Sequence, residues 1–176
     1  MKKEKLTKIV IAVTAVFVVG TLLFMFGGNI FSKGESVRGG DMTVMPEATG
    51  TTNEIKRSVV VEQDFINSTD TISKVGIVFT RLSYRQDIDL TIELLDGNTV
   101  LASTTMDITK VEDQHRTYVE ASSQLSGMKG KRLTIRIHPV TKEDTGLVIM
   151  MNKDADSSFT FDNKTIKGTL CFTVTE

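Results

Sequence analysis

The sequence predicts an all-β domain, an antiparallel β-sandwich, that follows one N-terminal membrane-spanning helix. Residues 9–32 contain no charged side chain, as a membrane span requires. From residue 57 onward, short segments alternate apolar and polar residues with the period of a half-buried strand. No helical pattern in that region is long enough to connect parallel strands, so regularly spaced short strands favour an antiparallel sandwich.

The charge distribution predicts how the span is oriented. Four lysines and one glutamate give residues 1–8 a net charge of +3 within a chain whose net charge is −1, which leaves −4 for the remainder. A helix over 9–32 is about 36 Å long and can cross a hydrocarbon core of about 30 Å. Because positive residues mark the cytoplasmic side, the basic head is expected inside the cell and the β domain outside, in a single-pass protein of the cell membrane.

A cleaved signal peptide would share this polarity. Its apolar region usually has only about 7–15 residues and ends at small residues of the A-x-A type. The run at 9–32 is longer, and it ends in Gly27-Gly28-Asn29-Ile30-Phe31-Ser32. We therefore predict an uncleaved signal anchor.

Residues 33–56 are predicted to form a flexible linker. The segment is rich in Gly, Thr and charged residues, contains Pro46, and has no apolar period. As a flexible coil it would span roughly 27 Å between its ends. The β-sandwich ectodomain is then expected at residues 57–176.

Residues 88–94 give the clearest strand pattern, since apolar and polar residues alternate at every position. The turn residues at 96–98 (Asp-Gly-Asn) predict a hairpin with a second strand at 100–106. Residues 132–138 alternate in the same way, with the odd-numbered apolar residues expected inside, and Pro139 ends that strand. The remaining predicted elements are a short helical turn within 108–114 and strands at 58–61, 75–81, 116–121, 147–151, 159–161 and 169–175.

Two groups of residues carry a resemblance to a known family. They are Gly76-Ile77-x-Phe79 with Tyr84, Asp89-Leu90-x-Ile92-x-Leu94 and Asp96-Gly97, and later Met128-Lys129-Gly130-Lys131-x-Leu133-x-Ile135-x-Ile137. On these residues, positions 65–151 resemble the jelly-roll accessory ectodomains of bacterial membrane proteins of cell-surface polysaccharide assembly. The resemblance implies a jelly-roll-like sandwich and a non-catalytic accessory role in the cell envelope.

The chain departs from that family at two polar positions. In those domains an arginine stands two places after the tyrosine, whereas here Gln86 takes that place and Arg85 is adjacent to Tyr84. An Asp-Asn pair of the family appears here as Asp113-Gln114. A site built on those polar residues would therefore be altered.

Few residues are suited to contact a glycan. Tryptophan is absent and tyrosine occurs only twice, at Tyr84 and Tyr118, so aromatic rings that could stack on a sugar are scarce. Arg85 can add polar contacts beside Tyr84. The glycan-contact candidates are therefore Tyr84, Arg85 and Tyr118.

One segment has the spacing of a metal-binding loop. Side chains that bear oxygen stand at alternate positions, as in a calcium loop: Asn152, Asp154, Asp156 and Ser158. The EF-hand pattern fails because Ser157 replaces its glycine and Asn163 its last glutamate. The alternative interpretation is a solvated acidic turn, and apart from this weak candidate for structural calcium no cofactor is predicted.

Cysteine chemistry is limited to one residue, Cys171, so no intramolecular disulfide can form. It lies within the alternating segment 169–175 and is predicted to be a small packed side chain.

The sequence contains no catalytic motif, so we do not expect an enzyme. Three function classes remain open. The first is an interaction module that binds a membrane or cell-envelope protein in polysaccharide synthesis or export. The second is a glycan-binding module that recognises a cell-surface glycan. The third is an envelope hydrolase, because paired carboxylates could flank a cleft. The lipid bilayer is the expected partner of the anchor, and the mildly acidic ectodomain argues against nucleic acid.

Overall fold

The structure is a computed structural model that describes residues 46–140 and 143–176. The predicted span at 9–32 and residues 33–45 of the predicted linker lie outside the described residues. Within the described residues, no helix is long and apolar enough to cross a membrane.

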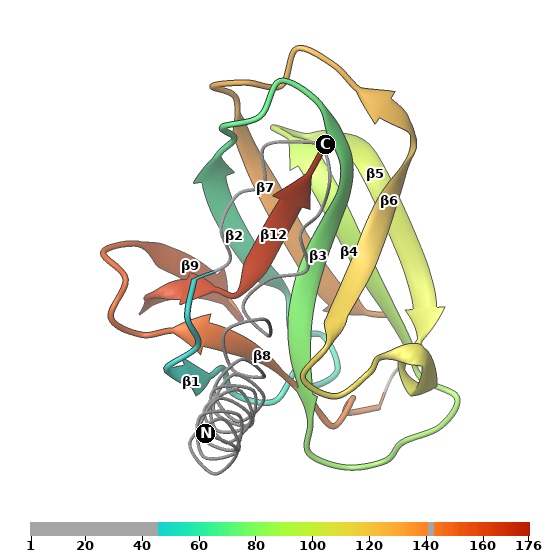
Figure 1. Ribbon diagram of the computed structural model, residues 1–176. Helices are drawn as coiled ribbons and strands as arrows, with labels where there is room; N and C mark the ends of the chain where they lie inside the picture. The colour runs from blue at the N-terminus through green and yellow to red at the C-terminus, as the bar shows by residue number, and fades with distance from the viewer. Residues whose placement is uncertain (1–45, 141–142) are drawn as a thin grey trace, which may run out of the picture. The chain divides into compact units, whose positions relative to one another are not determined.

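The described chain is all-β and forms two antiparallel sheets (Figure 1). The strands are β1 (Gly50–Thr51), β2 (Val61–Ile66), β3 (Ile72–Arg81), β4 (Asp89–Asp96), β5 (Thr99–Asp107), β6 (Arg116–Leu125), β7 (Arg132–Pro139), β8 (Leu147–Asn152), β9 (Ser158–Phe161), β10 (Lys164–Lys167), β11 (Thr169–Leu170) and β12 (Phe172–Thr175). One 3-10 helix, η1 (Ile108–Lys110), lies in the predicted helical turn and confirms it in a shorter form.

Strands that follow one another in the chain repeatedly change sheets. The first sheet has the order β1-β8-β3-β12, with β11 also paired to β8 and β6 also paired to β3. The second sheet has the order β10-β9-β2-β7-β4-β5. One hydrophobic core draws buried residues from the strands of both sheets. The predicted sandwich-like, antiparallel all-β fold is confirmed at this level.

Strand β7 shows how the alternation of the sequence sets the faces of a sheet. Leu133, Ile135 and Ile137 are buried at 1% exposure or less, whereas Thr134 and Arg136 lie on the other face. Because successive side chains of a strand point to opposite sides, one register places every apolar residue of β7 in the core.

The hairpin of β9 and β10 was not predicted. Its two-residue turn consists of Asp162 and Asn163, with φ of 50° and 61°, and Phe161 pairs with Lys164 across it. Two consecutive positive φ values are the pattern of a type I′ turn, which asparagine and aspartate tolerate without glycine.

Several predicted boundaries are wrong. The strand predicted at 58–61 begins only at Val61, because Ser58 adopts a left-handed conformation with φ of 63°. The strand predicted at 169–175 is two strands, β11 paired to β8 and β12 paired to β3. Between them, Cys171 donates its N–H to the carbonyl of Met150.

The predicted linker ends earlier than residue 56, because its last residues belong to the fold. Strand β1 pairs with β8, Thr52 donates its N–H to the carbonyl of Ile149, and Ile55 is completely buried. Ile55 is one isolated apolar residue in a polar segment, so no periodic pattern could reveal its burial.

Cys171 is buried at 1% exposure, as predicted, and it is a free thiol. Burial raises the pKa of the Cys171 thiol. Since the thiolate is the reactive form, this cysteine should be inert toward thiol reagents in the folded protein.

Gln63 joins the two sheets at the point where β9 separates from β2. Its side-chain amide nitrogen, Nε2, donates to the carbonyls of Asp64 and Ser158, at 2.8 and 3.3 Å. Its Oε1 accepts from the N–H of Leu170 and the hydroxyl of Thr169, at 3.1 and 3.3 Å. With only 2% of its surface exposed, Gln63 forms hydrogen bonds with backbone groups in both sheets, and the one to Leu170 is buried.

Ile135→Asp should unfold the domain, because an unpaired carboxylate in this core costs several kcal/mol. Thr134→Asp, on the opposite and exposed face of β7, should cost only about 1 kcal/mol, because it replaces the hydrogen bond from Thr134 to Asp64 with a pair of like charges in contact with water. Thermal or urea unfolding followed by circular dichroism measures both. Equal destabilisation by the two substitutions would contradict the faces assigned to β7.

Gln63→Met should destabilise the domain by about 2–4 kcal/mol, because the Leu170 N–H and the Ser158 carbonyl lose their buried partner. Glu62→Met is the matched control on the outer face of the same strand, where an ion pair with Arg136 is worth at most about 1 kcal/mol. Urea unfolding of the two variants measures the difference. A Gln63→Met variant as stable as Glu62→Met would show that the two sheets do not need this link.

Candidate functional site

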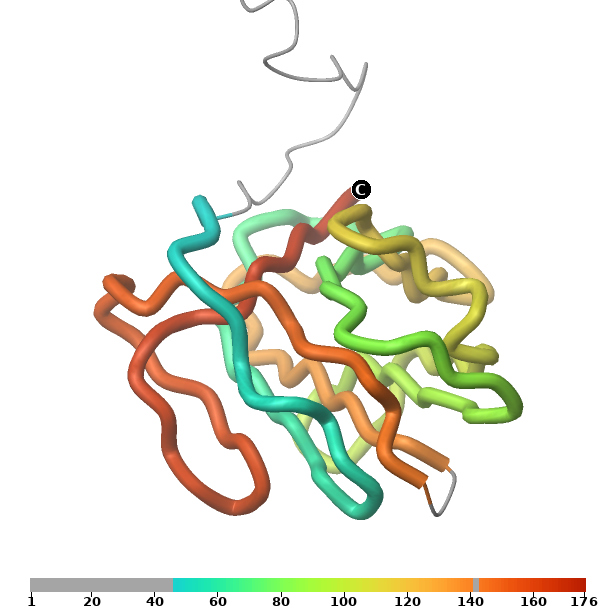
Figure 2. Tube along the Cα trace, turned by 90° about the horizontal axis from the view of Figure 1, so that it is seen from below, coloured from blue at the N-terminus to red at the C-terminus, as the bar shows by residue number. Residues whose placement is uncertain are grey.

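At one end of the domain, four connections between strands lie together (Figure 2). They are the segments at 52–60, 82–88, 108–115 and 140–146, of which 141 and 142 are not described; we call this surface the loop end. Leu82 donates its N–H to the carbonyl of Gly146, at 2.8 Å. Arg57 donates its N–H to Asp144 Oδ1, at 3.1 Å. Residues far apart in the sequence are thereby fixed beside one another.

Arg81, the last residue of β3, holds two of these connections in place. Its guanidinium donates to the carbonyls of Ile108 and Val111 in the connection after β5, at 2.8 Å for Ile108. Its backbone N–H donates to Asp113 Oδ1, at 2.9 Å. The same guanidinium carbon lies 5.3 Å from the ring centroid of Tyr84, a cation–π distance. Arg81 therefore links the β5–β6 connection to the Tyr84 ring.

The turn at Asp107 reinforces this connection. Asp107 caps η1 by accepting the N–H of Thr109 at 2.7 Å. This hydrogen bond holds the pKa of the Asp107 carboxyl below its usual range. The cap therefore keeps its charged, hydrogen-bonding form to a lower pH than an unpaired aspartate would.

Gly146 allows the connections at 82–88 and 140–146 to approach closely. Its φ is +67°, and a Cβ added there would lie 2.4 Å from Ser83 Oγ. Gly146 also donates its N–H to Glu54 Oε1, at 3.0 Å, and Thr145 Oγ1 donates to the carbonyl of Ile55, at 2.7 Å. These contacts tie the segment before β2 to the one before β8.

Large apolar side chains are unusually exposed at the loop end. Tyr84 is 91% exposed, Leu82 61% and Val140 57%. With Val60, which is 38% exposed, four of the six exposed large hydrophobic residues found within the described ranges therefore belong to this one surface. Such exposure is costly in water and often marks a contact surface.

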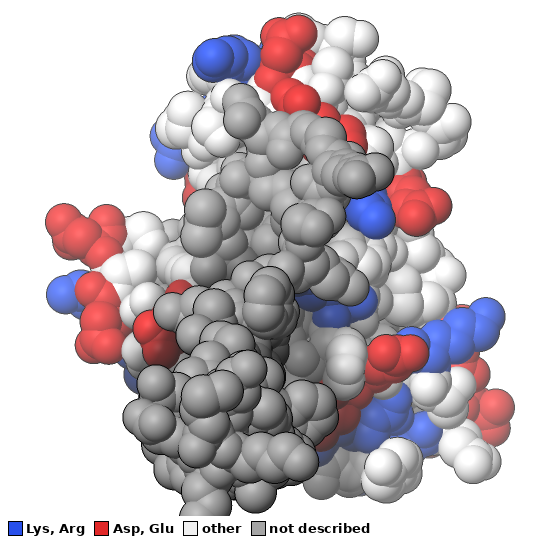
Figure 3. Space-filling view, viewed as in Figure 1, with Lys and Arg blue, Asp and Glu red and all other residues white. Residues whose placement is uncertain are grey.

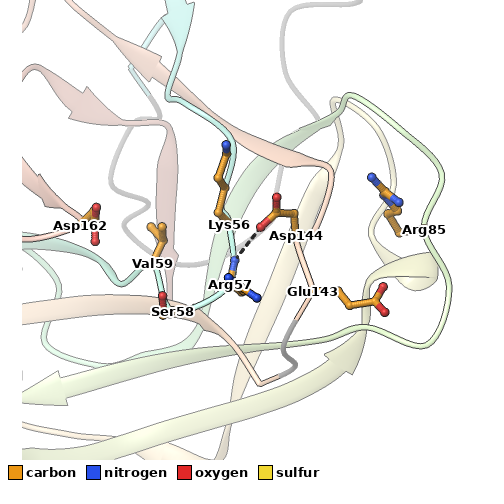
Figure 4. A pocket seen from close by; sticks show the side chains of 8 residues that line it. All are labelled: Lys56, Arg57, Ser58, Val59, Arg85, Glu143, Asp144 and Asp162. Carbon is orange, nitrogen blue, oxygen red and sulfur yellow. Dashed lines mark hydrogen bonds between the residues drawn. The ribbon is translucent and has the colours of Figure 1, made fainter.

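A cleft of about 610 Å³ lies beside these residues (Figure 4). Its lining carries cations, carboxylates and two smaller residues: Lys56, Arg57, Arg85, Glu143, Asp144, Asp162, Ser58 and Val59. Figure 3 shows basic and acidic side chains side by side at the lower right, over the connections after β3 and β5. The cleft therefore offers both signs of charge to a partner.

The structure brings together two of the three predicted glycan-contact residues. Tyr84 and Arg85 both lie in the connection after β3, and Arg85 lines the cleft. Tyr118 lies on β6, opposite Gly76, and the ammonium of Lys74 sits 4.4 Å from its ring centroid. Arg81 stands five positions after Gly76 along β3, roughly 17 Å away at about 3.3 Å per residue. Tyr118 does not belong to the loop end.

The predicted calcium ligands run across the turn between β8 and β9, from Asn152 at the end of β8 to Ser158 at the start of β9. Asn152 Oδ1 accepts the N–H groups of Asp154 and Ala155, at 2.8 and 3.1 Å, so this oxygen already caps the turn. Across residues 46–140 and 143–176, no group of three or more His, Cys, Asp or Glu could hold a metal ion. Calcium binding by Asn152, Asp154, Asp156 and Ser158 stays a prediction.

A second charged surface covers the outer face of the β2-β7-β4 strands. Arg136 binds Glu62 at 2.7 Å and lies 3.6 Å from Glu93, whose carboxylate is 4.0 Å from His138. These charges pair with one another, so they offer less to a partner than the loop-end cleft does.

The sequence could not reveal the cleft, although it singled out Tyr84 and Arg85. Lys56 and Arg57 fall in the predicted linker and Glu143 and Asp144 in an unpatterned connection, and only the fold brings them together. Arg81 carries no motif, since its role depends on carbonyls about 30 residues away along the chain.

No family model matches the chain, and no curated protein matches it.

Arg81→Gln should destabilise the domain by about 1.5–3 kcal/mol, because two carbonyls lose a charged donor. Amide hydrogen exchange within 108–113 should also become faster, since that connection loses its attachment to β3. Arg85→Gln is the matched control, because Arg85 is exposed and forms no recorded hydrogen bond among the described residues. Unchanged exchange at 108–113 in Arg81→Gln would contradict the role assigned to Arg81.

Proposed function

We propose that this protein is a single-pass membrane protein whose extracytoplasmic β-sandwich is a non-catalytic interaction module. The loop end is the surface that binds, and its partner is a membrane or cell-envelope protein. The exposure of Leu82, Tyr84 and Val140 beside a charged cleft is the observation that carries this proposal.

The chemistry of the loop end suits contact with a protein. Tyrosine and arginine dominate the binding energy of many protein interfaces, and here Tyr84 and Arg85 are adjacent and exposed. Leu82 and Val140 add apolar area, while Arg57 and the carboxylates of the cleft can fix the orientation of the partner. Connections held by a rigid sandwich also commonly carry binding residues.

The order of the strands supports the jelly-roll resemblance. Strands β2, β4 and β7 share one sheet while β3, β6 and β8 share the other, so the chain changes sheets at most of its connections. This alternation is expected of a jelly roll. The resemblance in turn suggests an accessory role in the synthesis or export of a cell-surface polysaccharide.

A glycan-binding module is the second candidate function. It is favoured by one observation, the polar cleft lined by Arg85 next to the exposed Tyr84 ring. A glycan array tests it directly. If the first proposal holds, the β domain should bind envelope glycans no more tightly than about 1 mM. Micromolar binding that Tyr84→Ala abolishes would favour the glycan module instead.

A cysteine placed at position 36 (Ser36→Cys) should react with a membrane-impermeant thiol reagent in intact cells, because the domain after the span is expected outside. The unsubstituted protein is the control, since its single thiol at Cys171 is buried. Labelling of Ser36→Cys only after lysis would contradict the topology. A mature chain that begins after Gly28 would show a cleaved signal peptide instead.

A photo-crosslinking amino acid at position 82 should capture a membrane or envelope protein in intact cells, because Leu82 lies in the proposed binding surface. The same amino acid at position 103 is the control, because Ser103 is exposed in the middle of β5, outside the segments of the loop end. Tyr84→Ala should reduce the crosslink at position 82 at least severalfold. Equal capture from positions 82 and 103 would contradict the proposal.

A further inference from the structure

A second groove lies where the edges of the two sheets face each other. Its volume is about 380 Å³, and its apolar lining consists of Met151 from β8, Phe159 and Phe161 from β9, and Ile166 from β10. The segment at 51–53, which contains the end of β1, also lines the groove. β1 and β10 are the outermost strands of their sheets, so the groove opens between two strand edges.

The charge of this groove has one sign. Among the residues that the structure describes, Lys153 and Lys167 contribute the only charged side chains of its lining, and no carboxylate lines it. Neither lysine forms an ion pair with a residue that the structure describes. An occupant with apolar groups and negative charge is therefore complementary to the groove.

The register of the β9–β10 hairpin shows which backbone groups are free to bind. Phe161 and Lys164 flank the two-residue turn and form its hydrogen-bonded pair. The next pair, Thr160 and Thr165, is then of the non-hydrogen-bonded kind, and the alternation repeats at Lys167. The N–H and C=O groups of Thr165 and Lys167 consequently point away from β9, toward the open edge.

We propose that this groove binds an extended, acidic segment of a partner protein, which adds to β10 as a further strand. Its backbone would pair with Thr165 and Lys167, as strand addition at a sheet edge requires. Alternate apolar side chains would lie over Phe159 and Ile166, and its carboxylates would approach Lys153 and Lys167. This surface is distinct from the loop end, and the inference does not depend on the proposed function of that end.

The open backbone edge distinguishes this occupant from a small amphiphile. A fatty acid or a similar anion could use the apolar lining and the lysines, but it would leave the N–H groups of Thr165 and Lys167 unused. A peptide strand uses the apolar lining, the two lysines and the open backbone edge at once.

The test measures binding of a fluorescent peptide, Glu-Val-Glu-Ile-Glu-Val-Glu, to the full-length chain by anisotropy. Replacing every Glu of the peptide by Lys should weaken binding at least tenfold, because the groove offers only positive charge. The double variant Lys153→Glu with Lys167→Glu should weaken binding of the acidic peptide by a similar factor. Lys129→Glu, which changes an exposed lysine outside the groove, should leave binding within about twofold.

Thr165→Pro tests the strand pairing, since it removes an edge N–H that β9 does not use. It should weaken peptide binding about tenfold, whereas Thr165→Val, which keeps the N–H, should not. Circular dichroism confirms that each variant is folded, and the charge-reversal variant provides an independent test if Thr165→Pro disrupts β10.

Three results would overturn the proposal. The acidic and basic peptides could bind equally, which would exclude charge complementarity. Dodecyl phosphate could displace the peptide while Thr165→Pro binds it normally, which would indicate a site for small amphiphiles. Self-association of the chain through β10 without peptide binding would make a second copy the occupant. In each case the crosslink from position 82 is unaffected, so failure here is distinguishable from failure of the proposed function.

Discussion

The arrangement of the loop end depends on one side chain, Arg81. It stands where β3 ends, and its five donors allow it to satisfy several carbonyls at once. By binding Ile108 and Val111 it closes the connection after β5, and by lying beneath Tyr84 it orients the connection after β3. An exposed tyrosine in an unsupported loop would lose much conformational entropy on binding. Support by Arg81 reduces that cost, and this links the packing of a strand end to recognition.

The two proposed binding surfaces use different parts of the same sandwich: the loop end is built from connections between strands, and the groove lies at the strand edges. Connections collect at the loop end because strands repeatedly cross from one sheet to the other, and Gly146 lets two of them touch. The groove lies over β9 and β10 at the end of the second sheet. There β9 separates from β2 after two residue pairs, and Gln63 donates to the carbonyl of Ser158 and accepts the N–H of Leu170. A single buried amide thus replaces a continued strand ladder between β9 and β2, while β10 ends the sheet and keeps an open edge.

The sequence predicted those features that repeat and missed those that depend on single residues. The alternation around Ile135 was sufficient to assign the buried face of β7, because a period of two fixes every side chain of a strand. Strand β10 was not predicted because its turn, Asp162 and Asn163, has no glycine. The burial of Ile55 was not predicted because its neighbours are polar. Tyr84 and Arg85 were selected by residue type, but no local pattern could reveal that Tyr118 lies elsewhere.

The most direct test of the central claim, that the loop end binds a partner, is amide hydrogen exchange of the full chain in native membranes and after purification. The account predicts slower exchange within 82–88 in native membranes than in the purified chain, with equal exchange in β7. Equal exchange at 82–88 in the two preparations would contradict it, because no partner would then cover Leu82 and Tyr84.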